Sequence, residues 1–167
     1  MHIRHLPIAI VAAVLLGGCS PTYNWRDFTS ADGTYRVLFP AKPDSHTRSI
    51  DLGGIRVDMT MTAAEVEGTT FAVGTALAPD AAMAQATLPA MRQALLRNIG
   101  ASLEVAAPEP GQPLAVDATG KGNGGPVRLV GRFVAKGARV YQVIVVGKPG
   151  AVPPEQTAQF LSSFTAQ

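Results

Sequence analysis

The chain has 167 residues, of which 16% are charged, and its 14 basic side chains nearly balance its 12 acidic ones. A chain of this length is typical of a single domain. The near balance excludes a global field that attracts nucleic acid, so we expect no nucleic-acid partner. The single cysteine, Cys19, excludes an internal disulfide and a zinc site built on cysteines.

The first 18 residues have the pattern of a secretory signal peptide. Arg4 precedes an apolar run over residues 6–16, and two small glycines follow. This run is shorter than the about 20 residues that a membrane-spanning helix needs. We therefore predict that residues 1–18 are removed, that residues 19–24 form a tether, and that residues 25–167 form one domain.

The motif at the predicted cleavage site, Leu16-Gly17-Gly18-Cys19, resembles the lipobox of bacterial lipoproteins. The resemblance implies cleavage between Gly18 and Cys19, lipidation of the Cys19 thiol and acylation of the new amino terminus. Acyl chains on Cys19 would hold the protein at a membrane of the bacterial cell envelope. Ser20 then implies the periplasmic face of the outer membrane. A plain signal peptide with an incidental cysteine, or a core cysteine, is the alternative.

The first half of the mature chain reads as strands joined by short turns. Residues 24–39 predict a hairpin that turns at Asp32-Gly33. Residues 47–52 and 55–63 predict a second hairpin, joined at two glycines, and residues 69–78 predict a further strand. Because the connections are short, we expect an antiparallel sheet.

An amphipathic helix is predicted in the middle of the chain. Apolar residues recur at helical spacing at Leu88, Met91, Leu95 and Ile99. Asp80 has the residue type of a helix cap before an alanine-rich stretch, and Gly100 ends the pattern. Pro89 predicts either the start of a new helix or a kink within one.

Strands resume after this helix, at residues 102–107, 113–120, 127–134 and 139–146, and a helix is predicted to open at Pro153-Pro154. The expected fold class is therefore α+β: an antiparallel sheet of hairpins with one amphipathic helix mid-chain and one C-terminal helix packed on it.

Three stretches carry a second resemblance: WRDFTSADGTYRVLFPAKP, GRFVAKGARVYQVIVVG and QFLSSF. Their layout is similar to the PsbP-like fold, in which a G-x-Y-x-V-x-F-P strand (residues 33–40) precedes a later Arg-Val-Tyr strand (139–141) and a terminal F-L-x-S-F helix (160–164). The resemblance covers most of residues 25–165. It implies binding to other proteins, often as an accessory subunit, rather than catalysis.

Catalytic and metal-binding motifs are missing from the sequence. His46 is the only histidine after the signal peptide, and we expect it in a solvated loop. The chain has no Gly-x-Ser-x-Gly elbow and no His-Glu-x-x-His motif. Residues 120–125 satisfy G-x-G-x-x-G, but a strand follows instead of a helix, so we expect a hairpin loop. Glu65 and Glu67 are expected in a solvated turn. We predict no enzyme, no cofactor and no metal site.

One surface hypothesis comes from the basic stretch in the second half. Pairing the last two strands about Lys136-Gly137 would place Arg132 opposite Tyr141, with Arg128 on the same face. Arg128, Arg132 and Tyr141 are therefore candidate partner-binding residues for an acidic partner or for anionic lipid head groups. The alternative is an ordinary solvent face whose aliphatic stems pack on neighbours.

The leading functional hypothesis is thus an envelope lipoprotein whose domain is a non-catalytic, protein-binding accessory module with an envelope protein partner. The alternative is a periplasmic carrier that holds a small apolar or lipid ligand between sheet and helix. Four methionines would line that cavity, unless they serve ordinary core packing: Met59, Met61, Met83 and Met91. An enzyme of unknown type is the third hypothesis.

Overall fold

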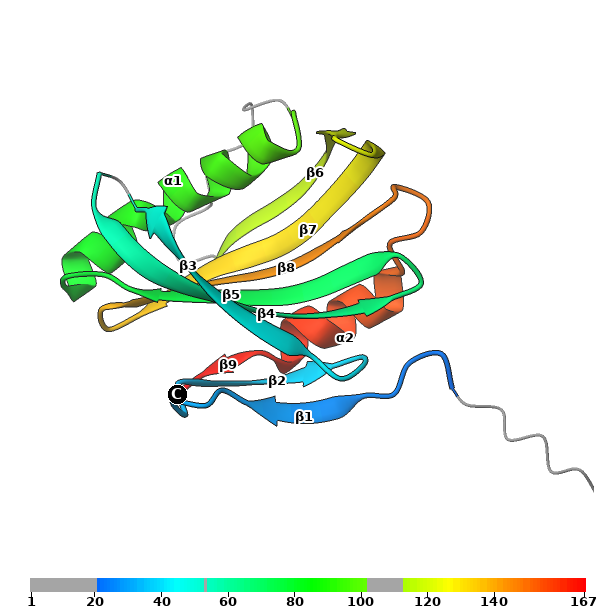
Figure 1. The fold of residues 1–167 in the computed structure, drawn as a ribbon, viewed down its shortest axis with the longest axis horizontal. Coiled ribbons are helices and arrows are strands. Elements are labelled where there is room, and N and C mark those ends of the chain that lie inside the picture. Colours follow the sequence, from blue (N-terminus) through cyan, green and yellow to red (C-terminus); the bar gives the residue numbers. More distant parts are fainter. Residues whose placement is uncertain (1–20, 53, 102–112) are drawn as a thin grey trace, which may run out of the picture.

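The structure is a computed structural model, and it describes residues 21–52, 54–101 and 113–167. Gly18, Cys19 and the strand predicted at residues 102–107 lie outside the described residues. The described part contains two helices, an antiparallel sheet of six strands and a second antiparallel sheet of three strands (Figure 1). This confirms the predicted α+β class.

The large sheet has the strand order β3-β4-β5-β8-β7-β6. All its neighbours are antiparallel, as the short connections predicted. The described strands include all the predicted ones outside residues 102–107, with ends shifted by a few residues. Their bounds are β3 Asp44–Asp51, β4 Arg56–Val66, β5 Thr69–Leu77, β6 Leu114–Gly122, β7 Gly125–Lys136 and β8 Arg139–Gly147.

The small sheet joins the two ends of the domain. Its strands are β1 (Arg26–Thr29), β2 (Tyr35–Phe39) and β9 (Thr165–Ala166), in the order β1-β2-β9. The hairpin between β1 and β2 confirms the predicted turn, where Gly33 has a φ of 68°. The sequence pattern did not predict β9, because two residues carry no readable alternation.

Helix α1 (Ala81–Asn98) runs through Pro89 without starting a second helix. Asp80 caps it as predicted, since its carboxylate accepts a hydrogen bond of 2.8 Å from the Met83 amide. Gly100 follows the helix with a φ of 62°, a conformation that favours glycine at a helix end. Helix α2 (Pro154–Ser163) begins with a proline in its first turn and buries Phe160.

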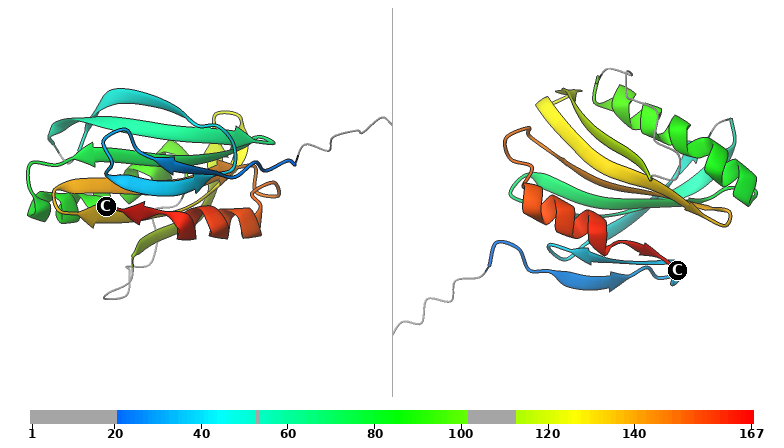
Figure 2. Two further views of the ribbon diagram at one scale, coloured as in Figure 1. Left: turned by 90° about the horizontal axis from the view of Figure 1, so that it is seen from below. Right: turned by 180° about the vertical axis from the view of Figure 1, so that it is seen from behind.

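The elements stack in layers around the large sheet (Figures 1 and 2). Helix α1 lies on one face, and α2 together with the small sheet lies on the other. Each face has its own hydrophobic core, because side chains alternate between the faces of a strand. The α1 core includes Met59, Ala76, Leu96, Leu129, Phe133 and Val140. The α2 core includes Tyr35, Phe39, Phe71, Tyr141, Val143 and Phe160.

The predicted pairing of β7 with β8 is wrong by two residues. Arg132 lies opposite Val143, and Tyr141 lies opposite Val134. The reason is the turn: Gly137, with a φ of 56°, and Ala138 connect the strands, and Lys136 pairs with Arg139. A shift of two residues keeps every side chain on the predicted face of the sheet.

One expected loop is instead a strand, and an expected hairpin loop is shorter than predicted. His46 is exposed on β3, opposite Met61 on β4, rather than in a loop. The glycine-rich run at residues 120–125 mostly belongs to β6 and β7, where Gly122 pairs with Gly125 across a two-residue turn. Hairpin pairing satisfies the backbone groups of both segments, which outweighs their low strand propensity.

Candidate functional site

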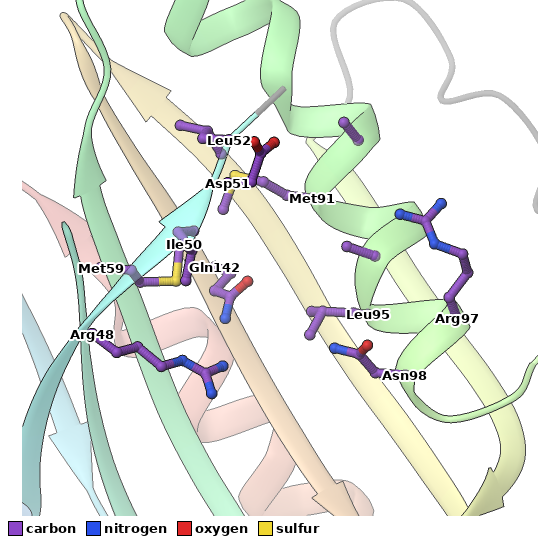
Figure 3. A pocket seen from close by; sticks show the side chains of 12 residues that line it. Arg48, Ile50, Asp51, Leu52, Met59, Met91, Leu95, Arg97, Asn98 and Gln142 are labelled. Carbon is purple, nitrogen blue, oxygen red and sulfur yellow. The ribbon is translucent and has the colours of Figure 1, made fainter. Parts of the chain in front are cut away.

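A cleft of about 300 Å³ opens between α1 and the outer strands of the large sheet (Figure 3). The cleft exists because α1 packs mainly on β6, β7 and β8, toward the edge of the sheet that is opposite to β3. The α1-facing side of β3 and β4 is therefore only partly covered. The volume lies at the lower end of the range of small-molecule sites, about 300–1,000 Å³.

The inner wall of the cleft is apolar. Met59 on β4 and Met91 on α1 are 4% and 5% exposed, and Leu95 of α1 and Ile50 of β3 are partly buried beside them. These side chains come from three elements, β3, β4 and α1, and the helix meets the two strands only in the folded chain. The wall offers flexible, polarisable contacts of the kind that thioethers provide to irregular apolar ligands.

One buried polar side chain interrupts this apolar wall. Gln142 of β8 is 7% exposed and points into the cleft (Figure 3). Its amide group donates a hydrogen bond of 3.3 Å to the sulfur of Met61. Gly74 of β5 makes room for this pair, because a Cβ atom there would lie 2.5 Å from that sulfur and 2.7 Å from the Gln142 side chain.

The rim of the cleft carries charge. Arg48 of β3 and Arg97 in the last turn of α1 are exposed and line it, together with Asp51 and Asn98. The Asp51 carboxylate accepts a hydrogen bond of 2.8 Å from the Gly54 amide. Within the described residues the ion pairs are Arg36–Asp27, Arg128–Asp117 and Arg139–Asp32. The two rim arginines are thus outside every ion pair of the described part.

The candidate binding residue Arg128 is engaged with its neighbour strand. Its guanidinium donates hydrogen bonds of 2.9 and 2.8 Å to the two carboxylate oxygens of Asp117 on β6. These bonds from Arg128 outweigh the effect of burial and hold the pKa of Asp117 below its usual value. Arg128 therefore lies in a fork-shaped pair, and its charge is largely compensated.

Arg132 and Tyr141 serve the fold rather than an open face. The Arg132 guanidinium donates a hydrogen bond of 3.0 Å to the Phe164 carbonyl and lies 5.6 Å from the centre of the Phe164 ring. Tyr141 is 1% exposed, and its hydroxyl donates a bond of 2.9 Å to the Thr34 carbonyl. Burial lowers the pKa of Arg132 and raises that of Tyr141. Tyr141 is therefore buried, whereas Arg128 and Arg132 stay partly exposed and are bonded within the domain.

The four methionines separate into distinct places. Met59 and Met91 line the cleft, whereas Met61 accepts the hydrogen bond of Gln142 behind it. Met83, in the first turn of α1, packs against the core without lining the cleft. Of the four methionines that were expected to line a cavity between sheet and helix, Met59 and Met91 do so.

The other candidate residues, Glu65 and Glu67, do not line the cleft. Glu65 is exposed but belongs to β4, where it pairs with Thr70, so the expected turn is wrong for this residue. Glu67 is exposed in the turn between β4 and β5, with a φ of 50°. In the described ranges, no three histidine, cysteine, aspartate or glutamate side chains gather closely enough to hold a metal ion.

No protein-family model, curated protein or solved structure matches this chain. Neither of the helices in the described part is long and apolar enough to cross a membrane.

Proposed function

We propose that this chain is a non-catalytic binding module that carries a small apolar or lipid ligand in the cleft between α1 and β3. The observation that supports it is the apolar inner wall of that cleft, formed by Met59, Met91 and Leu95 and open to solvent at a charged rim. Convergence of apolar side chains with a few polar groups is typical of ligand sites.

We further propose the setting in which the module acts. The lipobox resemblance supports lipidation of Cys19 and attachment to the bacterial cell envelope, at the periplasmic face of the outer membrane. The three architectural motifs support a PsbP-like variant of the α+β fold. Mass spectrometry of the amino-terminal peptide tests the anchor: we expect Cys19 as first residue with two or three acyl chains, and an unmodified thiol there would contradict it.

A protein-binding accessory role is the second candidate. It is favoured by a shallow groove between α2 and the outer strands β6 and β7, lined by Val130 and Leu161 together with Arg128. Crosslinking in native membranes would return one dominant partner under this function. The groove is separate from the cleft, so the two functions are tested independently.

The carrier function is tested by blocking the cleft. Within the described residues, both hydrophobic cores lie between Tyr23 and Ala166, so a chain of residues 20–167 contains every core residue of the described part. We expect single-chain amphiphiles, below micelle concentration, to raise its melting temperature, because a ligand that binds only the folded state stabilises it. Ala94 lines the cleft, so Ala94→Trp should abolish this rise.

The matched control is Ala86→Trp, an exposed position of the same helix that does not line the cleft. It should leave the ligand-induced rise unchanged. A rise that persists in Ala94→Trp, or no rise with any amphiphile in the unsubstituted chain, would contradict the carrier function.

A further inference from the structure

Building on the proposed function, we infer that the cleft is specific for an anionic single-chain amphiphile. Its negatively charged head group lies between Arg48 and Arg97, and its chain lies along Met59 and Met91. The inference rests on the two arginines that line the cleft, Arg48 from β3 and Arg97 from the side of α1 turned away from Arg48, and on the apolar wall formed by Met59 and Met91 (Figure 3).

Arg48 reaches the cleft because of strand register. It lies opposite Met59 in the β3–β4 pair, so both side chains belong to the α1-facing side of the sheet. Ile50, two residues further on β3, shares this side and lines the cleft as well. Arg48 therefore stands at the mouth, in line with the apolar wall.

Arg97 lines the cleft from the helix. It belongs to the last turn of α1, after the cleft-lining residues Met91 and Leu95. Neither arginine has a carboxylate partner in the described residues, in contrast to the paired Arg36, Arg128 and Arg139. Guanidinium groups bind carboxylates and phosphates through two parallel hydrogen bonds, so an anionic head group supplies the missing partner.

The other charged and polar groups of the rim leave the net charge around the cleft positive. Asp51 is the acidic side chain that lines the cleft, and its carboxylate already accepts a hydrogen bond from Gly54. The carbonyl end of α1 contributes a partial negative charge, which Arg97 compensates. Asn98 and Gln142 are neutral amides and can donate hydrogen bonds.

The size of the cleft limits the length of the ligand's acyl chain. About 300 Å³ equals the volume of roughly ten water molecules at about 30 Å³ each. This suits a short or medium acyl chain and excludes a two-chain phospholipid from complete burial. Decanoate is therefore the probe, with decyl phosphate as the anionic alternative head group.

Methionine methyl groups report binding at the site itself. In residues 20–167 labelled with ¹³C at the methionine methyls, decanoate should shift the signals of Met59 and Met91, which line the cleft. The Met83 signal, outside the cleft, should move little. Decanol and decyltrimethylammonium carry the same chain with a neutral and a cationic head group, and we expect them to bind at least tenfold more weakly than decanoate.

Two variants test the head-group contacts. Arg48→Ala and Arg97→Ala should each weaken decanoate binding about tenfold, since each removes a charge-assisted hydrogen bond. Each should leave decanol binding unchanged. Arg26→Ala, an exposed arginine of β1 on the small sheet, is the matched control and should change neither. Decyl phosphate that binds more tightly than decanoate, with the same dependence on both arginines, would support the inference with a phosphate head group.

Two results would overturn the inference, and only one of them would also contradict the carrier function. Equal binding of decanoate, decanol and decyltrimethylammonium would reject the anionic head group while the carrier function survives. If none of the probes shifts Met59 or Met91, both the inference and the carrier function fail.

Discussion

Single basic residues in this chain act through local partners as much as through charge. Arg132 lies over the Phe164 ring and donates to the Phe164 carbonyl, and Lys136 donates a bond of 3.0 Å to the Ala166 carbonyl. These bonds attach the end of the chain to β7. Two residues of the basic stretch are thus used in contacts within the domain, which no charge count reveals.

Arg132→Met tests this attachment. The variant keeps an apolar stem but loses the hydrogen bond to Phe164 and the cation–π contact, so we expect a loss of about 1–2 kcal/mol in the free energy of unfolding. Urea unfolding measures it. The control, Arg56→Met, changes an exposed arginine of β4. Equal losses in both variants would show that the Phe164 contacts add nothing.

The Asp117–Arg128 pair predicts a pH-dependent contribution to stability. The pKa of Asp117 is lower in the folded chain than its ordinary value of 3.8, so the folded state favours the carboxylate. The contribution is therefore present above that ordinary value and disappears as pH falls through the folded pKa. The Asp117 side chain is 57% exposed, and solvent screening keeps the contribution below about 1 kcal/mol.

Asp117→Asn should accordingly lower the free energy of unfolding at pH 7 by a few tenths of a kcal/mol to about 1 kcal/mol. The difference from the unsubstituted chain should be smaller at pH 2–3 than at pH 7, because protonation of Asp117 below its ordinary pKa removes the charge that Arg128 stabilises. Urea unfolding at both pH values measures it, with the exposed Asp44→Asn as control. A difference that grows in acid would contradict the assignment.

At the scale of elements, the end of α1 is set by its contact with β6. Gly120 lies so close to the helix end that a Cβ atom there would be 2.0 Å from the Ile99 carbonyl oxygen. The Cβ atom would clash with backbone atoms of Ile99, so no side-chain rotation could relieve the clash. The same region holds Arg97 at the rim, which links the packing of β6 to the geometry of the cleft.

Gly120→Ala should therefore cost about 1–3 kcal/mol in the free energy of unfolding, because overpacking forces the backbone to shift. Differential scanning calorimetry would show it as a lower melting temperature. Gly124→Ala, in the turn of the same hairpin with open space around it, is the matched control and should change stability little. Equal melting temperatures for the two variants would contradict the close approach.

The apolar pattern of α1 was predicted in part. Leu88, Met91 and Ile99 are buried as expected, but Leu95 is only partly buried because it borders the cleft. Arg92, which is outside this apolar spacing, is nevertheless 9% exposed. Spacing along the helix predicts which residues share a side, but the neighbouring element decides how deeply each of them is covered.

At the scale of the whole molecule, the C-terminal segment connects the two sheets, because Arg132 and Lys136 of β7 donate hydrogen bonds to its carbonyls. Strand β9 pairs with β2, the Gln167 amide donates a bond of 2.8 Å to the Thr34 carbonyl, and Tyr141 of the large sheet donates to the same carbonyl. The chain end therefore contributes to the layer that covers the α2 side of the large sheet.

Deleting residues 165–167 should destabilise the domain by about 1–3 kcal/mol, since it removes backbone hydrogen bonds to β2 and the acceptor of Lys136. Guanidinium unfolding measures the loss. Gln167→Ala keeps the backbone amide that bonds to Thr34, so it should be nearly neutral. A truncated chain as stable as the complete one would show that β9 is dispensable.

By itself the sequence determined the elements and their class. Alternation, turn glycines and the cap at Asp80 act over a few residues, so hairpins, both helices and the α+β class could be read from it. The tertiary structure alone decided the β7–β8 register, β9, the internal use of Arg132 and Tyr141, and the cleft. The register depends on which two residues form the β7–β8 turn. Strand β9, the internal use of Arg132 and Tyr141, and the cleft depend on contacts between segments far apart in the chain, where burial and partners are set by packing and not by local pattern.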